Sequence, residues 1–186
     1  MEPVPVHVLL EGPSDVAALE AVLATRAPAV PRTAYRLVDM GGVTNTATHL
    51  RAAGPAPVLG LCDERETWVV VGALRRRGLV VEGEQDLGRL GFFVCRADLE
   101  EELIRALGVP ECMELLGRLG LGGRFATFSG QPAWAGRPVE VRLHRFMGVA
   151  SGRKVRLAGA MASALPPERV PPPIARLVDR LAGRPP

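Results

Sequence analysis

The chain has 186 residues, of which 47% are hydrophobic, and this suits one globular unit with a sizeable core. No apolar run reaches the roughly 18–20 residues that span a bilayer, so we expect no membrane association. The start, Met-Glu-Pro, lacks the basic and apolar regions of a signal peptide, and a cytoplasmic location is expected. The three cysteines have no metal-ligand spacing and are expected to be buried, reduced thiols: Cys62, Cys95 and Cys112.

The net charge of +3 conceals an uneven distribution. Residues 1–117 carry 17 acids and 11 arginines, a net of −6, whereas residues 118–186 carry 3 acids and 12 bases, a net of +9. The first part could gather cations and the second could hold a phosphate backbone, although basic residues can also simply solvate a surface. The candidate nucleic-acid-binding residues are Arg124, Arg142, Arg145, Arg153 and Arg156.

Short apolar runs alternate with helical patterns over the first half of the chain. The runs at 6–10, 35–40, 57–62 and 92–95 are predicted strands, and three of them are nearly continuous in apolar residues, as buried parallel strands are. This alternation predicts an α/β fold with a mostly parallel four-stranded sheet flanked by helices. The predicted helices of this part cover 14–26, 44–53, 66–77 and 98–108.

The pattern changes after the fourth predicted helix. Gly108 and Pro110 end that helix, and the remaining sequence is helical apart from a Gly-rich loop at 120–138, in which "RFATF" could form a short strand. We therefore expect an α/β core over 1–109 and a basic helical extension over 110–186 that packs on the core. Its predicted helices cover 111–119, 138–148, 153–164 and 171–182.

Acidic side chains follow three of the four predicted strands. The carboxyl ends of parallel strands meet at one edge of a sheet, where ligands of open sheets bind, so these acids are expected to converge. Crowded carboxylates repel one another unless a cation joins them, and hard oxygen ligands select Mg²⁺ or Mn²⁺. The alternative is that acids in a first helical turn only complement the helix dipole. The acids are Glu11 and Asp15, with Ser14 as the expected N-cap, then Asp63 and Glu66, and finally Asp98, which starts a capping-box pattern, and Glu100.

Four motifs carry a resemblance to a known family. "LLEGPSDVAALEAVL" resembles the first Toprim motif and "VLGLCDERE" the second, while "MGGVTN" (40–45) is similar to the Gly-rich turn after the second Toprim strand. "FFVCRADLEEELIRALG" and "SGRKVRLAGAMASAL" (151–165) resemble the Leu-Glu motif and the lysine helix of nucleases of the overcoming-lysogenisation-defect (OLD) family. The resemblance covers about 6–181 and implies a Toprim-like fold with metal-dependent nuclease activity.

The resemblance also implies roles for individual residues. Glu11 matches the motif-one glutamate, a metal ligand or general base, and Lys154 matches a lysine that stabilises charge on the scissile phosphate. Lys154 is the single lysine among 23 basic residues, which suggests a place where arginine does not serve, although chance could also leave one lysine. The remaining implied metal ligands are Asp15, Asp63 and Glu100.

The chain departs from the family pattern in two ways. The second aspartate of motif two falls on Arg65, and the next residue, Glu66, could substitute as a metal ligand if the loop turns it inward. No P-loop pattern is present, so we expect a stand-alone Toprim chain, with a separate ATPase subunit and a second copy of the chain as candidate partners.

Three functions remain open from the sequence. The first is metal-dependent phosphodiester hydrolysis of nucleic acid, with DNA as the expected substrate. The second is a catalytically weak or inactive module that binds nucleic acid or regulates a partner ATPase, in which case Arg65 marks a decayed site. The third, which the large basic surface disfavours, is phosphoryl or nucleotidyl transfer on a small nucleotide.

Overall fold

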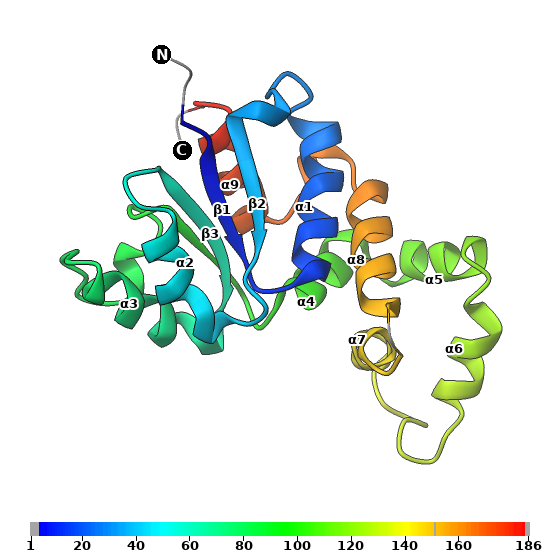
Figure 1. Cartoon of the computed structure of the whole chain (residues 1–186). Helices are drawn as coiled ribbons and strands as arrows, with labels where there is room; N and C mark the ends of the chain where they lie inside the picture. Colours follow the sequence, from blue (N-terminus) through cyan, green and yellow to red (C-terminus); the bar gives the residue numbers. More distant parts are fainter. Residues whose placement is uncertain (1–3, 151, 185–186) are drawn as a thin grey trace.

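The computed structural model describes residues 4–150 and 152–184 (Figure 1). Within this part, the four strands predicted for the sheet and the eight predicted helices are present to within a few residues. The elements are β1 (Val6–Leu10), α1 (Pro13–Arg26), β2 (Tyr35–Asp39), α2 (Thr46–Ala52), β3 (Val58–Asp63), η3 (Glu64–Glu66), α3 (Thr67–Arg76), β4 (Phe92–Cys95), α4 (Leu99–Leu107), α5 (Val109–Arg118), α6 (Gly122–Ser129), α7 (Val139–Gly148), α8 (Arg153–Ala164) and α9 (Pro172–Leu181), with further short 3₁₀ turns at Arg32–Ala34, Val43–Asn45, Glu84–Asp86 and Pro167–Arg169.

The four strands form one parallel sheet in the order β2-β1-β3-β4. Leu10 at the end of β1 pairs with Asp39 of β2, and Asp63 at the end of β3 pairs with Cys95 of β4, so the carboxyl ends of the strands are aligned. This confirms the predicted α/β class, and every strand pair is parallel. We call this edge, at the lower end of the strands in Figure 1, the carboxyl edge.

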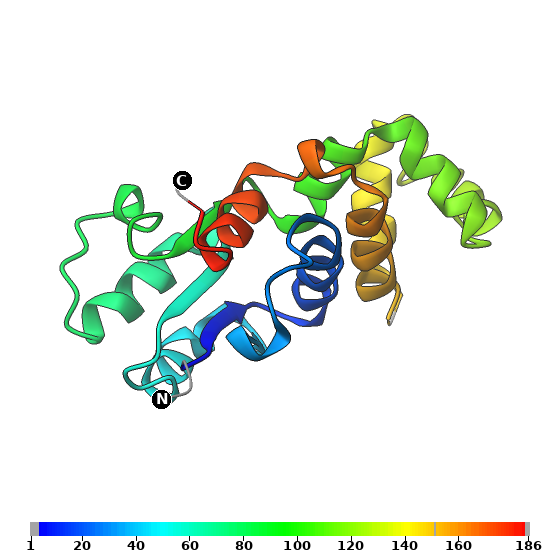
Figure 2. The same cartoon turned by 90° about the horizontal axis from the view of Figure 1, so that it is seen from above.

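Both faces of the sheet are covered by helices (Figures 1 and 2). Val8 and Leu10 of β1 belong to the hydrophobic cluster that includes α1 and α9, whereas Leu9 belongs to the cluster that includes α2 and α3. Successive residues of a strand face opposite sides, so a strand buried on both sides is apolar throughout. In β3, a Cβ at Gly60 would lie 2.6 Å from the Phe92 ring, and this close approach requires glycine.

The helical extension packs on the α/β part. α8 runs along α1, α9 covers β4 and β3, and α7 contacts α4. Leu19 of α1, Leu103 of α4 and Met161 of α8 belong to one hydrophobic cluster. The two parts therefore share a core, while α5 and α6 project away from the sheet (Figures 1 and 2).

Two sequence-based expectations were wrong. "RFATF" is not a strand in a loop but part of α6, because Phe125 and Phe128 are three residues apart and both become buried on one side of a helix. Ser14 is not the N-cap of α1: that position is Gly12, followed by Pro13 at the first helical position, which suits proline. Ser14 is instead buried within the helix.

Two further features concern the chain as a whole. Among residues 4–150 and 152–184, no helix combines the length and apolar character needed to cross a bilayer. Cys62, Cys95 and Cys112 are free and buried, as expected.

Candidate metal centre

Three adjacent strands place carboxylates at the carboxyl edge. Glu11 directly follows β1, and Asp63 is the last residue of β3. After β4, the chain continues through Ala97, whose φ of 61° is unusual for a residue with a Cβ, to Asp98 and then to Glu100 in the first turn of α4. The order β1-β3-β4 within the sheet makes these three chain segments neighbours.

A group of carboxylates, here called the Glu11 cluster, consists of Glu11, Asp63 and Glu66. Their carboxylate oxygens lie within 4.8 Å of one another. Glu66 ends the short 3₁₀ turn after β3, and its Oε2 is buried without a hydrogen-bond partner among the described residues, while Arg65 is exposed. The loop therefore turns Glu66 inward. In the second Toprim motif the second aspartate falls one residue earlier, at the position of Arg65.

Burial and mutual repulsion perturb the Glu11 cluster. Burial, followed by the negative charges of Glu11 and Asp98, raises the pKa of Asp63 to about 8. Burial and the neighbouring Glu11 raise the pKa of Glu66 to about 7. A bound cation would relieve both the desolvation and the repulsion.

Asp15 is influenced by acids of both this cluster and the next acidic group. It occupies the first turn of α1, where its Oδ2 accepts a 2.8 Å hydrogen bond from the Gly12 N–H. Burial raises its pKa to about 7 in spite of that bond, and the charges of Glu100 and Glu11 add to the increase.

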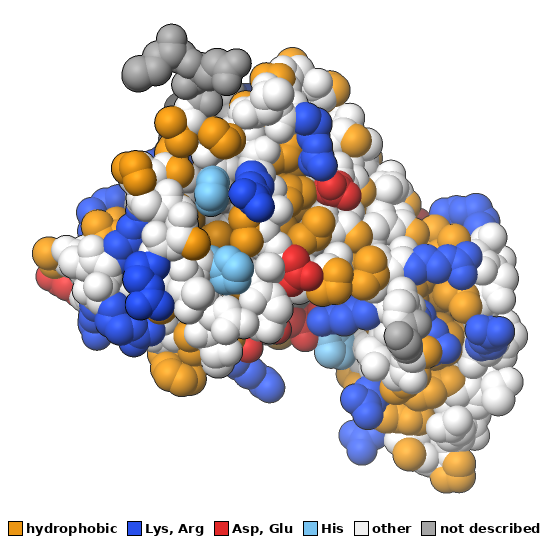
Figure 3. All heavy atoms as spheres, in the orientation of Figure 1, with side chains coloured by type: hydrophobic (Ala, Val, Ile, Leu, Met, Phe, Trp, Pro, Cys, Tyr) orange, Lys and Arg blue, Asp and Glu red, His pale blue; other side chains and the backbone are white. Residues whose placement is uncertain are grey.

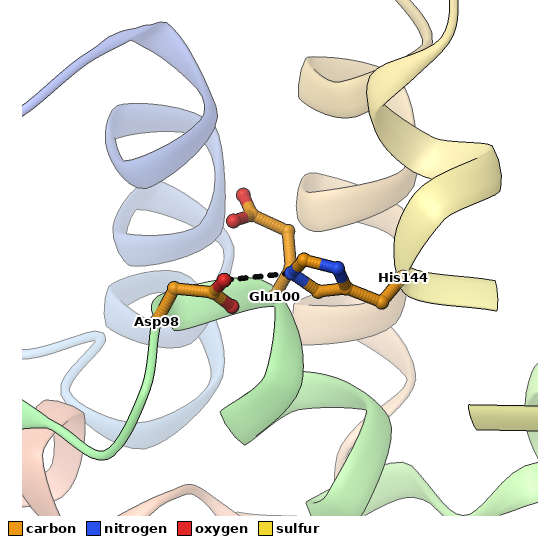
Figure 4. Close-up of side chains that lie close together, drawn as sticks. All are labelled: Asp98, Glu100 and His144. Atoms are coloured by element: carbon orange, nitrogen blue, oxygen red, sulfur yellow. Dashed lines mark hydrogen bonds and ion pairs between the residues drawn. The ribbon is translucent and has the colours of Figure 1, made fainter. Parts of the chain in front are cut away.

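A second group, here called the Asp98 cluster, consists of Asp98, Glu100 and His144 (Figure 4). His144 Nε2 lies 2.6 Å from Asp98 Oδ2, and each of the three residues has a possible ligand atom within 4.8 Å of the others. Glu100 is only 3% exposed, and its Oε1 has no hydrogen-bond partner among the described residues. Burial alone would raise the pKa of Asp98, but the hydrogen bond with His144 lowers it, and the same hydrogen bond raises the pKa of His144.

Lys154 of α8 points at this edge. Its Nζ forms an ion pair with Glu100 Oε2 at 3.1 Å, whereas Glu100 Oε1 is the oxygen without a partner among the described residues. Burial alone would lower the pKa of Lys154, but the charge of Glu100, with those of Asp15 and Glu11, raises it. The ammonium group is therefore held charged beside both clusters. Figure 3 shows acidic, basic and histidine side chains adjoining in the hollow between the sheet part and the helical extension.

The five candidate nucleic-acid-binding arginines lie on three helices of the extension. Arg145 of α7 is exposed, and so is Arg124 on the projecting helix α6. Arg153 lies over the Phe146 ring at 3.9 Å and donates to the Phe146 carbonyl, and Arg156 donates to the Leu119 carbonyl. The last of the five, Arg142, is partly buried, with an Nε that has no partner in the described part. Arg124 and Arg145 are therefore the exposed arginines of the five for which the described residues provide no side-chain hydrogen bond or ion pair.

Sequence reasoning missed His144 as a site residue. It is one of three histidines and lies in a basic helix 46 residues after Asp98, so no local spacing signals the pairing. Asp98 did carry a local signal as the first residue of a capping pattern. In the structure its Oδ1 does accept a 2.8 Å hydrogen bond from the Glu101 N–H, leaving Oδ2 for His144.

The donor set suits a divalent cation. Two buried carboxylate oxygens, one each on Glu66 and Glu100, are without protein partners in the described residues, and a buried oxygen without a partner is costly. Carboxylate oxygens are the ligands that Mg²⁺ and Mn²⁺ take in proteins. Either cluster could therefore hold a divalent ion.

Solved structures of the C-terminal regions of OLD proteins share this fold. The region from Xanthomonas campestris pv. campestris matches with a TM-score of 0.69 and 18% identity, over 96% of this chain and 94% of that one. The region from Burkholderia pseudomallei matches with a TM-score of 0.65 and 16% identity, over 97% and 98% of the two chains. No family model and no curated protein matches the sequence. The structural likeness confirms the predicted OLD-like Toprim fold.

Proposed function

We propose that this protein hydrolyses phosphodiester bonds in DNA, as a nuclease or nickase that depends on Mg²⁺ or Mn²⁺. The observation that carries the proposal is the convergence of Glu11 from the end of β1 with Asp63 and Glu66 from the end of β3, next to a lysine ammonium group. The OLD-like Toprim fold is consistent with a metal-binding module of this kind.

The carboxylates of the site have different proposed roles. Glu11, Asp63 and Glu66 would hold one cation, and Asp15, which is influenced by the charges of both Glu100 and Glu11, would be a further ligand together with Glu100 of the Asp98 cluster. Divalent ions, when bound at such sites, activate a water and stabilise the leaving oxygen. Glu11 is the candidate general base because it matches the glutamate of the first Toprim motif, and it belongs to the cluster.

Lys154 would stabilise charge on the phosphate. Its ion pair with Glu100 positions the ammonium group beside the acids, and about half of its side chain is exposed and thus open to a ligand. A compact ammonium group can enter a crowded site that a broad guanidinium group cannot. Exposed arginines, Arg145 and Arg124 among them, would hold the DNA backbone.

The test is cleavage of supercoiled plasmid with Mg²⁺, with Mn²⁺ or with a chelator. We expect nicking that requires the metal and is abolished in Glu11→Gln, whereas Glu20→Gln, which alters an exposed α1 ion pair with Arg32, serves as the matched control and stays active. Lys154→Arg should keep DNA affinity but lose at least about tenfold in turnover, or roughly 1.4 kcal/mol of barrier.

Three results would contradict the proposal. They are cleavage in the presence of chelator, equal cleavage by Glu11→Gln and wild type, and no cleavage of any DNA by wild type. If metal and DNA bind without cleavage, the chain is instead a binding or regulatory module. The presence of Arg65 in place of the second aspartate would agree with that function.

A further inference from the structure

The Asp98 cluster contains a nitrogen donor that the acidic motifs do not. Figure 4 shows Asp98 and Glu100 at the start of α4 and His144 reaching towards them from α7. The imidazole Nε2 already contacts Asp98 Oδ2 at 2.6 Å. The three possible ligand atoms lie within 4.8 Å of one another, which is close enough for one cation to contact all three after small side-chain adjustments.

Packing holds His144 at this place. α7 contacts α4 and α8, and the neighbours of His144 in the helix, Leu143 and Phe146, are each only 1% exposed. The helix is thus fixed on its apolar side, and this fixes the side of α7 from which His144 projects. The His144 side chain remains 42% exposed, which leaves an approach for ions.

Glu100 is an independent sign of a ligand. Its side chain is only 4% exposed, and Oε2 is occupied by Lys154 whereas Oε1 has no partner among the described residues. Leaving a buried charged oxygen unpaired costs more than leaving a neutral one, so the arrangement favours a cation at this oxygen.

We propose that His144 is a nitrogen ligand of a divalent ion held with Asp98 and Glu100, so that this site prefers Mn²⁺ and other transition ions to Mg²⁺. Mg²⁺ binds almost exclusively to oxygen ligands, whereas imidazole nitrogen is a good ligand for transition metals. The affinity of a nitrogen-containing site for divalent ions increases from Mn²⁺ to Cu²⁺ along the first transition series. The inference rests on the metal dependence in the proposed function and specifies which metals the second cluster favours.

The direct test is pulsed electron paramagnetic resonance of Mn²⁺ bound to the full chain. A coordinated imidazole gives the electron spin echo a ¹⁴N modulation. We expect this modulation in wild type, its loss in His144→Gln, and its retention in His49→Gln, a matched control in α2. Absence of the modulation in wild type, or an unchanged modulation in His144→Gln, would overturn the inference.

A second measurement compares affinities for Mn²⁺ and Mg²⁺ by calorimetry. His144→Asp replaces the nitrogen with oxygen and keeps a ligand at the position, so the Mn²⁺ preference should fall about tenfold or more while Mg²⁺ binding persists. An unchanged preference would count against a nitrogen ligand. The two proposals can be told apart by their outcomes. If the chain shows the ¹⁴N modulation but cuts no DNA, the nuclease proposal is wrong and the His144 inference stands. If the chain cuts DNA but shows no ¹⁴N modulation, the nuclease proposal stands and the His144 inference is wrong.

Discussion

Glu66 and Arg65 are neighbours in sequence but have opposite environments. Arg65 is exposed, whereas Glu66 is turned towards Glu11 and Asp63. The 3₁₀ turn of residues 64–66 presents its third residue to the site, so a carboxylate one position later than the family pattern still reaches the cluster. At the scale of single residues, we therefore propose that Glu66 takes the place of the second aspartate of the Toprim motif, which in this chain falls on Arg65.

The residue-scale prediction uses this pair. Glu66→Gln removes a ligand charge but keeps the size of the side chain, so Mn²⁺ affinity measured by calorimetry should fall about tenfold or more, or about 1.4 kcal/mol. Arg65→Gln changes an exposed charge next to it and should leave the affinity within about twofold. Wild-type affinity in Glu66→Gln, or a larger effect of Arg65→Gln, would mean that Glu66 is not a working ligand.

At the scale of elements, the Gly-rich turn after β2 supports the site. Gly42 N–H donates a 2.9 Å hydrogen bond to the Glu11 carbonyl, and Asn45 Nδ2 donates to the Met40 carbonyl at 2.9 Å. Gly41 and Gly42 have φ values of 64° and 118°, a region that residues with a Cβ rarely adopt. The turn thereby fixes the backbone of Glu11 from the neighbouring strand.

The acids at the strand ends predict an unusual pH dependence of stability. The pKa values of Asp15, Asp63 and Glu66 are raised to about 7, 8 and 7, whereas unfolded carboxyl groups titrate near 4. Between about pH 4 and pH 8 the folded state therefore binds more protons than the unfolded state, and the free energy of unfolding falls as pH rises. Without metal, Tm should decline from pH 5 to pH 8.5.

The variant Asp63→Asn removes the most strongly raised of these groups. Its Tm should decline less over the same range, while Glu20→Gln should follow wild type. Added Mn²⁺ should raise the Tm of wild type more at pH 8 than at pH 5.5, because the ion competes with protons for the carboxylates. A metal-free Tm that is constant or rises with pH would contradict these pKa shifts.

At the scale of the whole molecule, the acidic edge and the basic helices adjoin. Because α8 packs along α1 and α7 packs against α4, Lys154 and His144 lie at the carboxyl edge of the sheet. The arrangement combines a candidate cation site with a surface able to attract phosphates, which neither part of the chain contains alone.

The prediction at this scale concerns salt. DNA binding measured by fluorescence anisotropy should weaken steeply as salt rises, since each phosphate contact releases counterions. Arg145→Glu should weaken binding and reduce the slope of log K against log salt by about one or more. Arg180→Glu is the matched control, an exposed arginine on α9, and should have little effect. Binding that is insensitive to salt, or equal loss in both variants, would contradict a phosphate-binding surface on α7.

The sequence by itself determined the sheet and the acids at its edge. Short apolar runs on both sides of helical patterns specify parallel strands, and the fixed geometry of such a sheet brings Glu11, Asp63 and Asp98 to one end. These are local signals: each acid lies within a few residues of its strand, so its position follows once the strand is recognised.

Only the tertiary structure decided which side chains meet across the two parts. The pairs Lys154–Glu100 and His144–Asp98 join residues 54 and 46 positions apart, and they depend on how α7 and α8 pack on α4 and α1. Helix α6 was also decided by packing, because a run as short as "RFATF" can belong to a strand buried on both faces or to a helix until the burial of Phe125 and Phe128 on one side is known. These pairings depend on the shared core, in which many weak apolar contacts together determine how the helices pack. No residue spacing in the sequence predicts them.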